Sequence, residues 1–345
     1  MGINLTRTIE WKAGSVTTID QTKLPNRTSL LKIESCDGIA KAIRTMQVRG
    51  APLLGAVAAY GLALTAFHSK AKDKDQIMRE LAASAEILKR TRPTAVNLFW
   101  ALKRVMKKAE ETRGDAVDVV KAVVDESQMI ATEDVEANQK IGKHGTNIVD
   151  DGDNLLTHCN AGSLATVGYG TALGVIRAAW SDGKSIKVIA TETRPLLQGA
   201  RLTTYELLRE RIPVTLITDN MVGYIMSKGL VDKVIVGADR IVKDAVVNKI
   251  GTYTIAVLAK EHKVPFYVAA PKSTFDMNRL AEDVIVEERN IEEVVKFGDM
   301  RIAPKKISAL NPAFDITPMK YITAIIYEED VISPEEFQKL SAING

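Results

Sequence analysis

Two side chains that can transfer protons, Cys159 and Asp239, each follow a short apolar run in the second half of the chain. Moving a proton between two neighbouring carbons needs a base for one position and an acid for the other, and a thiol facing a carboxylate can supply both. We therefore predict that Cys159 and Asp239 form an acid/base pair. Each also has a simpler explanation: Cys159 as an inert buried thiol, and Asp239 as a helix cap or the ion-pair partner of Arg240.

The residues beside Cys159 allow a second chemistry. His158 and Asn160 flank it, and Cys, His and Asn together form the machinery of one class of hydrolases. Neighbouring residues of a strand point to opposite faces, so His158 is expected to face away from Cys159, which makes the hydrolase the weaker interpretation. A helix predicted to begin at Thr166 would bring its amino terminus near the thiol and tune its pKa.

Three predicted helices begin just after a basic segment. Helix amino termini expose N–H groups that attract anions, and a nearby arginine or lysine adds positive charge. One such segment is weak evidence, because an arginine before a helix is usually only solvated, but three in one chain favour a phosphorylated ligand. The segments are Arg49-Gly50-Ala51-Pro52, Arg92-Pro93-Thr94 and Asn248-Lys249-Ile250-Gly251.

A glycine-rich segment points to a competing function. Gly168-Tyr169-Gly170 with Gly174 resembles a degenerate dinucleotide-binding fingerprint, and Glu192 stands where a ribose-binding acid is expected. However, these glycines fall inside a helix predicted over Thr166–Trp180 and not in the turn after a strand. We therefore interpret them as small residues that let the helix pack close to a sheet, and a dehydrogenase is the weaker alternative.

The candidate residues must be positioned by the elements that precede them. From Asp151 onward, short apolar runs alternate with helices, which is the pattern of a doubly wound parallel sheet. Ligands bind such sheets at the carboxyl ends of the strands, so residues that follow different strands should converge there. We predict strands at Asn154–His158, Lys187–Thr191, Val214–Ile217, Lys233–Val236 and Phe266–Ala269, and helices at Thr166–Trp180, Arg201–Arg209, Met221–Lys228 and Thr252–His262.

The first part of the chain has a different pattern of predicted elements: two strands joined through Gly14, followed by a run of helices. We expect two domains: residues 1–130, smaller and mostly helical with a short antiparallel β element, and residues 131–345, a Rossmann-like catalytic domain. The predicted strands are Thr8–Trp11 and Ser15–Ile19, and the predicted helices are Ile39–Met46, Leu53–Ala66, Ile77–Lys89, Ala95–Glu111, Asp115–Ser127 and Glu133–Asn147.

Composition argues against nucleic-acid binding, a structural zinc site and a membrane span. The 345 residues carry a formal net charge of only +3, which does not supply the basic surface of a nucleic-acid binder. Two cysteines and four histidines make a disulfide framework or a structural zinc site unexpected. Charged residues interrupt the first 25 residues, and no uncharged apolar run approaches the roughly 20 residues of a membrane span. We expect a cytoplasmic protein without membrane or nucleic-acid partners.

Many segments together resemble the methylthioribose-1-phosphate isomerases of methionine salvage. That family belongs to a superfamily with ribose-1,5-bisphosphate isomerases and the regulatory subunits of translation initiation factor 2B. The resemblance runs nearly end to end, and so many segments in the same order are highly specific. They include Ile9-Glu10-Trp11, Asp20-Gln21-Thr22-Lys23-Leu24-Pro25, Arg49-Gly50-Ala51-Pro52, Arg92-Pro93-Thr94-Ala95-Val96-Asn97-Leu98, Thr157-His158-Cys159-Asn160-Ala161-Gly162, Glu192-Thr193-Arg194-Pro195, Gln198-Gly199-Ala200-Arg201-Leu202, Gly237-Ala238-Asp239-Arg240-Ile241 and Asn248-Lys249-Ile250-Gly251-Thr252.

The resemblance implies an aldose-ketose isomerase that converts 5-methylthioribose 1-phosphate to 5-methylthioribulose 1-phosphate. It implies catalytic roles for Cys159 and Asp239, no cofactor or metal, a homodimer and the two-domain fold described above. The chain departs from the family pattern at Ser163 and Leu196, and the latter bears on fine substrate preference. The implied substrate-binding residues are Arg49, Gly50, Ala51, Arg92, Gln198, Asn248 and Lys249.

Three alternatives stay open beside this expectation. Ribose 1,5-bisphosphate would need a second phosphate cluster in place of an apolar pocket, whereas a 5-deoxypentose 1-phosphate would fit that pocket. In a different class, the chain could be a regulatory subunit like its initiation-factor relatives. Retention of both Cys159 and Asp239 argues against this last interpretation, because a regulator has no need of the pair.

Overall fold

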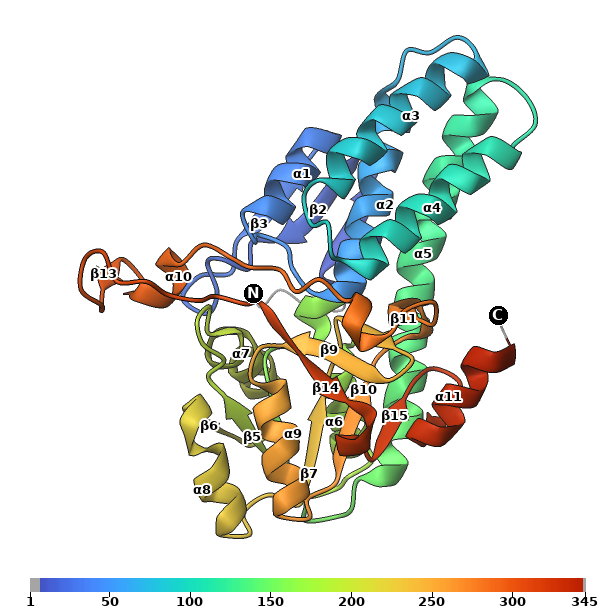
Figure 1. The fold of residues 1–345 in the computed structure, drawn as a ribbon. Helices are drawn as coiled ribbons and strands as arrows, with labels where there is room; N and C mark the ends of the chain where they lie inside the picture. Colours follow the sequence, from blue (N-terminus) through green and yellow to red (C-terminus); the bar gives the residue numbers. More distant parts are fainter. Residues whose placement is uncertain (1–6, 344–345) are drawn as a thin grey trace. The chain divides into compact units, whose positions relative to one another are not determined.

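The computed structural model describes residues 7–343, and it divides into two compact units (Figure 1). Unit 1 contains the described residues up to Lys140, together with Gly162–Thr171 and Pro271–Thr274. Unit 2 contains Ile141–Ala161, Ala172–Ala270 and the chain from Phe275 onward. The domain boundary after residue 130 stays a prediction.

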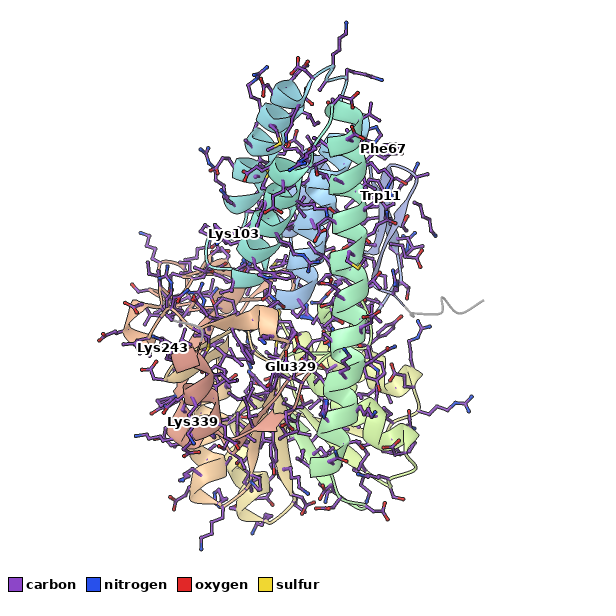
Figure 2. The ribbon with its side chains drawn as sticks, turned by 90° about the vertical axis from the view of Figure 1, so that its right-hand side faces the viewer. Trp11, Phe67, Lys103, Lys243, Glu329 and Lys339 are labelled. Carbon is purple, nitrogen blue, oxygen red and sulfur yellow. The ribbon has the colours of Figure 1, made fainter. Side chains whose placement is uncertain are left out.

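Unit 1 begins with a small antiparallel sheet. Strands β1 (Ile9–Lys12) and β2 (Ser15–Ile19) confirm the predicted pair, and a third strand, β3 (Leu30–Ile33), adds to β2. β3 is mostly exposed, with only Ile33 buried, and so it lacks the apolar pattern by which the other strands were predicted. Trp11 of β1 stacks on Tyr60 with ring centroids 5.9 Å apart and meets Phe67 edge-on at 5.8 Å, which ties the sheet to a helix. Trp11 and Phe67 are labelled in Figure 2.

The helices of unit 1 surround α2 (Ala51–His68), which packs against α1, α3 and α4 (Figure 1). Among the described residues, α2 is the one helix long and apolar enough to cross a membrane, but 72% of it is buried inside the protein. This burial identifies it as a core helix, because a helix that is apolar on every side needs neighbours all round. The other helices are α1 (Cys36–Arg44), α3 (Lys74–Lys89) and α4 (Val96–Glu111).

The next helix, α5, corrects a prediction. Two helices were expected, at Asp115–Ser127 and Glu133–Asn147, but the chain forms one helix over Ala116–Gly145. The residues between the two predicted helices include no glycine or proline, and Ile130 and Ala131 are buried there, so the helix is held through this stretch by packing.

Unit 2 is built on a seven-stranded sheet with strands in the order β16-β15-β10-β7-β4-β5-β6. All neighbours pair in parallel except β16, which is antiparallel at the edge, so the predicted doubly wound parallel sheet is confirmed. Four predicted strands have the bounds found, and the fifth ends one residue early, at Thr157. The strands are β4 (Asn154–Thr157), β5 (Lys187–Thr191), β6 (Val214–Ile217), β7 (Lys233–Val236), β10 (Phe266–Ala269), β15 (Ala324–Ile326) and β16 (Val331–Ile332).

Both faces of this sheet are covered. Leu155 and Leu156 of β4 lie in different apolar clusters, because successive side chains point to opposite faces. One cluster includes residues of α8, α9 and α11, and the other includes residues of α6 and α7. The helices are α6 (Ala172–Ser181), α7 (Thr204–Arg209), α8 (Val222–Ser227), α9 (Thr252–Glu261), α10 (Glu292–Val295) and α11 (Pro334–Ile343), with a π-helix over Gly199–Thr203.

The helix predicted at Thr166–Trp180 begins later, at Ala172. Tyr169 and Gly170 have left-handed backbones, with φ of +74° and +85°, and the hydroxyl of Thr166 accepts the N–H of Gly170 at 3.2 Å. These residues form a loop of unit 1 instead, so no helix amino terminus at Thr166 faces Cys159. Gly168 and Gly170 of the fingerprint-like segment therefore lie in a loop, and the helical placement that weighed against a dinucleotide site was wrong.

A second sheet of unit 2, in the order β11-β8-β9-β14, was not predicted. Its antiparallel hairpin β8–β9 begins just after Asp239 and ends at Lys249. The strands are β8 (Arg240–Val242), β9 (Ala245–Lys249), β11 (Phe275–Asp276) and β14 (Phe314–Pro318), with a separate pair β12 (Lys296–Phe297) and β13 (Met300–Arg301). Short 3₁₀ turns lie at Thr146–Ile148, Ser163–Ala165, Asp219–Met221, Lys272–Thr274, Ala281–Asp283 and Met319–Tyr321.

Candidate active site

Cys159 lies two residues beyond β4 and has a left-handed backbone, with φ of +61°. This conformation costs an L-residue about 1–2 kcal/mol and persists only where the surroundings enforce it. Here two hydroxyls hold the peptide groups on either side: Thr193 accepts the N–H of Cys159 at 2.9 Å, and Thr203 donates to its carbonyl at 2.6 Å. Cys159 as a whole residue is half-buried.

A chain of hydrogen bonds runs from the amide of Cys159 through neighbouring strands. The hydroxyls of Thr193 and Thr191 lie 3.2 Å apart, and the hydroxyl of Thr191 lies 2.6 Å from Nδ1 of His158. Nε2 of His158 lies 2.8 Å from the carbonyl oxygen of Ile250. Since a carbonyl only accepts, Nε2 carries the proton, and Nδ1 accepts from Thr191 in the neutral ring.

Burial lowers the pKa of His158 below its usual range, and the positive charge of Lys249 adds to this. The ring is therefore neutral near pH 7. Both of its nitrogens are engaged, by Thr191 and by Ile250, which leaves neither to act as a base for Cys159. The structure thus agrees with the expectation that His158 turns away, and the Cys-His-Asn hydrolase has no base.

The loop after β5 is held by a carboxylate. Asp219, which follows β6, accepts the N–H of Thr193 at 2.8 Å and that of Arg194 at 2.7 Å. Thr193 has φ of +65°, an uncommon conformation for a β-branched residue, and Leu197 has φ of +57°. Left-handed residues thus gather on the two loops that carry Cys159 and Gln198, as they do at functional sites.

Lys249 is the basic residue among the predicted site residues of unit 2. It ends β9, is buried, and among the described residues no carboxylate forms an ion pair with it. Burial lowers its pKa, whereas negative charge on Cys159 and Asp239 acts in the opposite direction. A buried ammonium without an ion-pair partner is costly, and an anionic ligand would relieve that cost.

Asp239 stands where β7 passes into β8, and its N–H donates to the carbonyl of Val247 at 2.9 Å. This bond fixes its backbone against β9, the strand that carries Asn248 and Lys249. Asn248 is buried, and its amide donates to the hydroxyl of Thr252 at 3.0 Å. Asp239, Asn248 and Lys249 therefore lie at the same end of the β8–β9 hairpin.

Gln198 has an unsatisfied acceptor. Its side chain is 4% exposed, and Oε1 has no hydrogen-bond partner within the part of the chain that is described. Gln198 directly precedes the π-helix Gly199–Thr203, a form of helix that is often found at functional sites. Because buried polar atoms are almost always paired, this oxygen is able to accept a hydrogen bond from a donor outside the chain.

The amino terminus of α9 corrects one part of the anion prediction. Its N–H groups were expected to attract a phosphate, but a carboxylate already receives two of them: Asp315 of β14 accepts from Gly251 at 2.7 Å and from Tyr253 at 3.1 Å. Asp315 lies opposite Asn248 in the register of β14 with β9. Asp315 would therefore compete with any anion for these two N–H groups.

The other predicted binding residues belong to unit 1. Arg49 is buried, and its Nε donates to Oε1 of Gln21 at 3.1 Å. Gly50 caps α2 with φ of +108°, and a Cβ there would overlap the backbone of Ala165, so only glycine fits. Ala51 is the first residue of α2, and Arg92 precedes α4 with Nη1 3.7 Å from Sδ of Met46.

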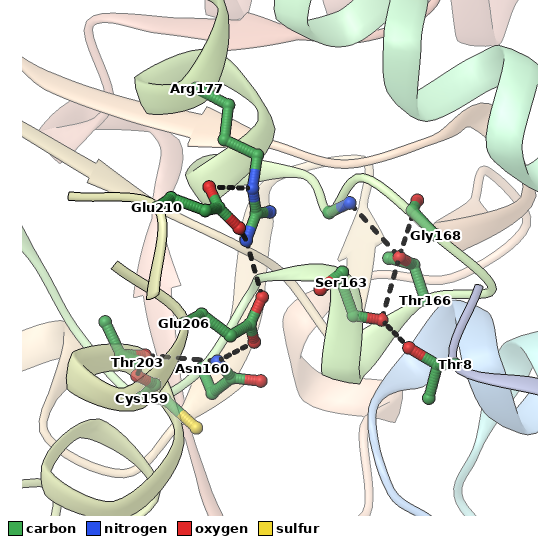
Figure 3. Close-up of polar contacts among 11 residues, drawn as sticks. Thr8, Cys159, Asn160, Ser163, Thr166, Gly168, Arg177, Thr203, Glu206 and Glu210 are labelled. Carbon is green, nitrogen blue, oxygen red and sulfur yellow. Dashed lines mark hydrogen bonds and ion pairs between the residues drawn. The ribbon is translucent and has the colours of Figure 1, made fainter. Parts of the chain in front are cut away.

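One cluster at Cys159 was not foreseen from the sequence (Figure 3). Nδ2 of Asn160 donates to Oε1 of Glu206 at 2.8 Å and to the hydroxyl of Thr203 at 3.2 Å. The other oxygen of Glu206 forms an ion pair with Arg177 at 2.7 Å, and both residues are buried. A glutamate on the apolar face of a helix, beside Leu202 and Leu207, is the signal that could have revealed it.

The sequence matches the Initiation factor 2 subunit family over residues 47–334. It is 51% identical to the methylthioribose-1-phosphate isomerase of Carboxydothermus hydrogenoformans over 342 residues, which cover 98% of this chain and 99% of that protein. Family membership therefore extends over both units of the fold.

Two crystal structures are similar over almost their whole length. The 5-methylthioribose 1-phosphate isomerase of Pyrococcus horikoshii OT3 gives a TM-score of 0.91 at 46% identity, covering 99% of this chain and 97% of that one. The subunit delta of translation initiation factor eIF-2B from A. fulgidus gives 0.85 at 50% identity, covering 96% and 99%. The fold and length thus recur in proteins described by two different roles.

Proposed function

This chain belongs to the Initiation factor 2 subunit family, and from that premise we propose that it is an aldose-ketose isomerase of methionine salvage. The reaction converts 5-methylthioribose 1-phosphate to 5-methylthioribulose 1-phosphate. The observation that carries the proposal is that Cys159 and Asp239 follow the carboxyl ends of β4 and β7, which are neighbouring parallel strands of the sheet. Similarity at about half of all positions to proteins bearing that name supports the choice of substrate.

The substrate poses a specific chemical problem. Its anomeric oxygen carries the phosphate, so the sugar ring cannot open freely, and an acid must protonate the ring oxygen. Hydrogen then moves from C2 to C1, as a proton through an enediol-type intermediate or as a hydride. We assign Asp239 to the C2 hydroxyl or the C2 hydrogen and Cys159 to the role of the partner acid. These residues, with the fixed charges around them, supply the acid/base chemistry and the electrostatic stabilisation that the reaction needs.

We propose that the residues implied by the family resemblance bind the substrate. In unit 2, Lys249 offers the positive charge for a phosphate, Gln198 offers an acceptor for a sugar hydroxyl, and Asn248 lies beside Lys249. The four residues of unit 1 assigned to the same task are Arg49, Gly50, Ala51 and Arg92. Arginine is well suited to phosphate because its planar fork can donate two parallel hydrogen bonds.

A regulatory role is the second candidate. The observation that favours it is the 50% identity to a structure described as a subunit of translation initiation factor eIF-2B. A regulator would bind without turning a substrate over, whereas the held backbone of Cys159 and the unpaired acceptor of Gln198 are features of a site built for a small ligand. Turnover is therefore the observation that separates the two candidates.

We further propose a cytoplasmic homodimer. Support comes from large apolar side chains that are strongly exposed within residues 280–310, including Ile285 at 80%, Met300 at 65% and Leu310 at 84%. Exposed apolar groups gathered in one segment are typical of a protein–protein contact. Sedimentation of the purified protein should give twice the mass of one chain, and an Ile285→Lys, Leu310→Lys variant should sediment as a monomer.

A carbon-NMR assay tests the activity directly. Purified protein is incubated with 5-methylthioribose 1-phosphate, and the appearance of a ketone carbon is followed for the wild type, Cys159→Ser, Asp239→Asn and Cys36→Ser. Cys36 is the matched control because it is the other cysteine of the chain and is buried in unit 1. The wild type and Cys36→Ser should form the ketone, and the two site variants should lose it.

The pattern of failure also distinguishes the alternatives. Turnover of ribose 1,5-bisphosphate or of a 5-deoxypentose 1-phosphate, but not of the methylthio sugar, would change the substrate assignment and keep the chemistry. Absence of turnover with all three sugars would favour the regulatory candidate. Normal activity of Asp239→Asn would refute the catalytic assignment of Asp239.

A further inference from the structure

We propose that Thr203, Asn160 and Glu206 are positioning residues that fix the orientation of Cys159, with Arg177 as the anchor of the set. The proposal rests on the proposed function in that it concerns the catalytic thiol assigned there. Its physical content, a held thiol, can be measured without substrate. The group joins the loop after β4 to the π-helix, α7 and α6 (Figure 3).

The hydrogen bonds around Thr203 have a defined direction. Its hydroxyl is fully buried, and it receives an N–H from Nδ2 of Asn160 at 3.2 Å. The amide nitrogen can only donate, so the single proton of the hydroxyl points elsewhere, and the carbonyl of Cys159 lies 2.6 Å away to accept it. Thr203 is therefore oriented toward Cys159 by Asn160.

Asn160 is itself held in orientation by a carboxylate. Its Nδ2 also donates to Oε1 of Glu206 at 2.8 Å, and a charged acceptor strengthens that bond. Glu206 is 1% exposed, which is rare for a carboxylate unless it is paired. Its ion pair with Arg177 offsets this burial and holds it in place, and Arg177 in turn bonds Glu210 through Nε at 2.6 Å.

Thr203, Asn160 and Glu206 act on Cys159, whose left-handed backbone is unfavourable without bonds from its surroundings. Cys159 has a left-handed backbone, and its two flanking peptide groups are bound by hydroxyls from different elements. Thr193 fixes the amide, and Thr203 fixes the carbonyl. With both held, the Cα–Cβ direction of Cys159 is fixed, and the thiol keeps one relation to the charge of Lys249.

A neighbouring threonine offers a matched control. Thr204 follows Thr203 directly, but its hydroxyl donates back along its own helix to the carbonyl of Ala200 at 2.5 Å. Thr203→Val and Thr204→Val therefore remove the same atom, one residue apart, and only the first removes the bond to Cys159. Thr203→Ser keeps the hydroxyl and serves as the rescue variant.

The experiment measures the rate of alkylation of Cys159 by iodoacetamide against pH, in full-length substrate-free protein carrying Cys36→Ser. Because Lys249 favours the thiolate, releasing the thiol from its fixed orientation should raise the midpoint of the pH profile in Thr203→Val by about half a pH unit or more. Thr204→Val and Thr203→Ser should match the parent. Equal profiles for Thr203→Val and Thr204→Val would overturn the proposal.

Steady-state kinetics with the methylthio sugar give an independent readout. A misplaced catalytic group lowers kcat, so Thr203→Val should lose about tenfold or more in kcat with KM changed less than about threefold. A fall in KM and kcat together with a lowered melting temperature, without a change in the alkylation profile, would indicate a merely structural role and refute the proposal.

The experiment can still be interpreted if a variant does not fold or if the wild type is inactive. If Thr203→Val does not fold, Glu206→Gln takes its place, since the amide cannot serve both Asn160 and Arg177 as an acceptor in the way a carboxylate does. It should shift the alkylation midpoint in the same direction, and an unshifted profile would refute the proposal. If the wild type turns over no sugar phosphate, the proposed function fails, while the alkylation profiles still decide whether Cys159 is held.

Discussion

One carboxylate oxygen of Asp315 lies 2.7 Å from the backbone nitrogen of Gly251 and accepts its hydrogen bond. Its other oxygen accepts from Tyr253, so a residue of β14 caps α9 from outside the helix. This explains why the chain before α9 lacks a capping side chain of its own, since Gly251 stands at that position. A cap that comes from a residue so far along the chain makes the helix start depend on the pairing of β14 with β9.

The titration of Asp315 gives the first prediction. Burial raises its pKa to about 6, against 3.8 for an ordinary aspartate, despite the opposing effect of the two N–H donors. Between these pH values the folded protein binds more protons than the unfolded chain, so the free energy of unfolding falls as pH rises through this window. Asp315→Asn cannot titrate. The stability of the wild type relative to this variant should therefore fall by up to about 3 kcal/mol from about pH 4 to pH 7.

Melting temperatures of the two proteins, measured at half-unit intervals across that range, provide the check. The difference between them should change only between about pH 4 and pH 6.5 and stay level above. A constant difference across the whole range would mean that the carboxyl of Asp315 titrates as in the unfolded chain.

Lys249 carries the second prediction. Burial lowers its pKa below that of the unfolded chain, so at pH 7 burying the lysine costs the folded state stability. Lys249→Met keeps the length of the side chain and should raise the free energy of unfolding by about 1 kcal/mol, or roughly 2–4 °C in Tm. The same variant should bind a phosphorylated sugar at least about tenfold more weakly, because the opposing charge is gone.

Calorimetric melting and isothermal titration with the substrate measure both effects. Lys187→Met, at the exposed start of β5, is the control and should change neither. The gain in stability should shrink at high pH, as the folded-state lysine of the wild type loses its proton first. A stabilised variant with unchanged affinity would remove Lys249 from the binding site.

The third prediction concerns Gly50. A Cβ there would overlap the backbone of Ala165, whereas Gly152, with φ of +90°, has nothing within 4 Å of the same position. Both glycines have positive φ, so Gly152→Ala measures the backbone cost alone, about 1 kcal/mol. Gly50→Ala adds a collision with backbone and should destabilise by more than about 3 kcal/mol. Chemical denaturation of the two variants makes the comparison, and equal losses would show that the segment around Ala165 can give way.

Strands β5, β6, β7 and β10 were predictable to the residue because each is a short apolar run bounded by polar or turn-forming residues. Cys159 and Asp239 follow β4 and β7, which are neighbours in the sheet, so their placement at one edge followed from topology. The resemblance to a known family supplied the substrate, which no strand pattern could.

The structural features that could not be predicted from the sequence depend on contacts between residues far apart in the chain. Strands β9 and β14 are held by their pairing with each other, which sets Asn248 opposite Asp315, a residue far away in the chain. The left-handed backbone of Tyr169 belongs to a loop that takes the place of the first part of the helix predicted at Thr166–Trp180, and no local pattern marks a tyrosine in that conformation. The bonds from Thr203 and Glu206 to the loop of Cys159 likewise require the folded sheet.

Each of the two units is made of several separate segments, and this limits how one unit can be exchanged between related proteins. Unit membership changes after Lys140, Ala161, Thr171, Ala270 and Thr274, so neither unit is one continuous stretch of gene. A chimaera that exchanges one unit with a relative must therefore be spliced at five joints, and end-to-end fusion of two ancestral modules does not yield this arrangement. Cys159 lies two residues before one of these joints, so a splice at Ala161 falls beside the proposed catalytic thiol.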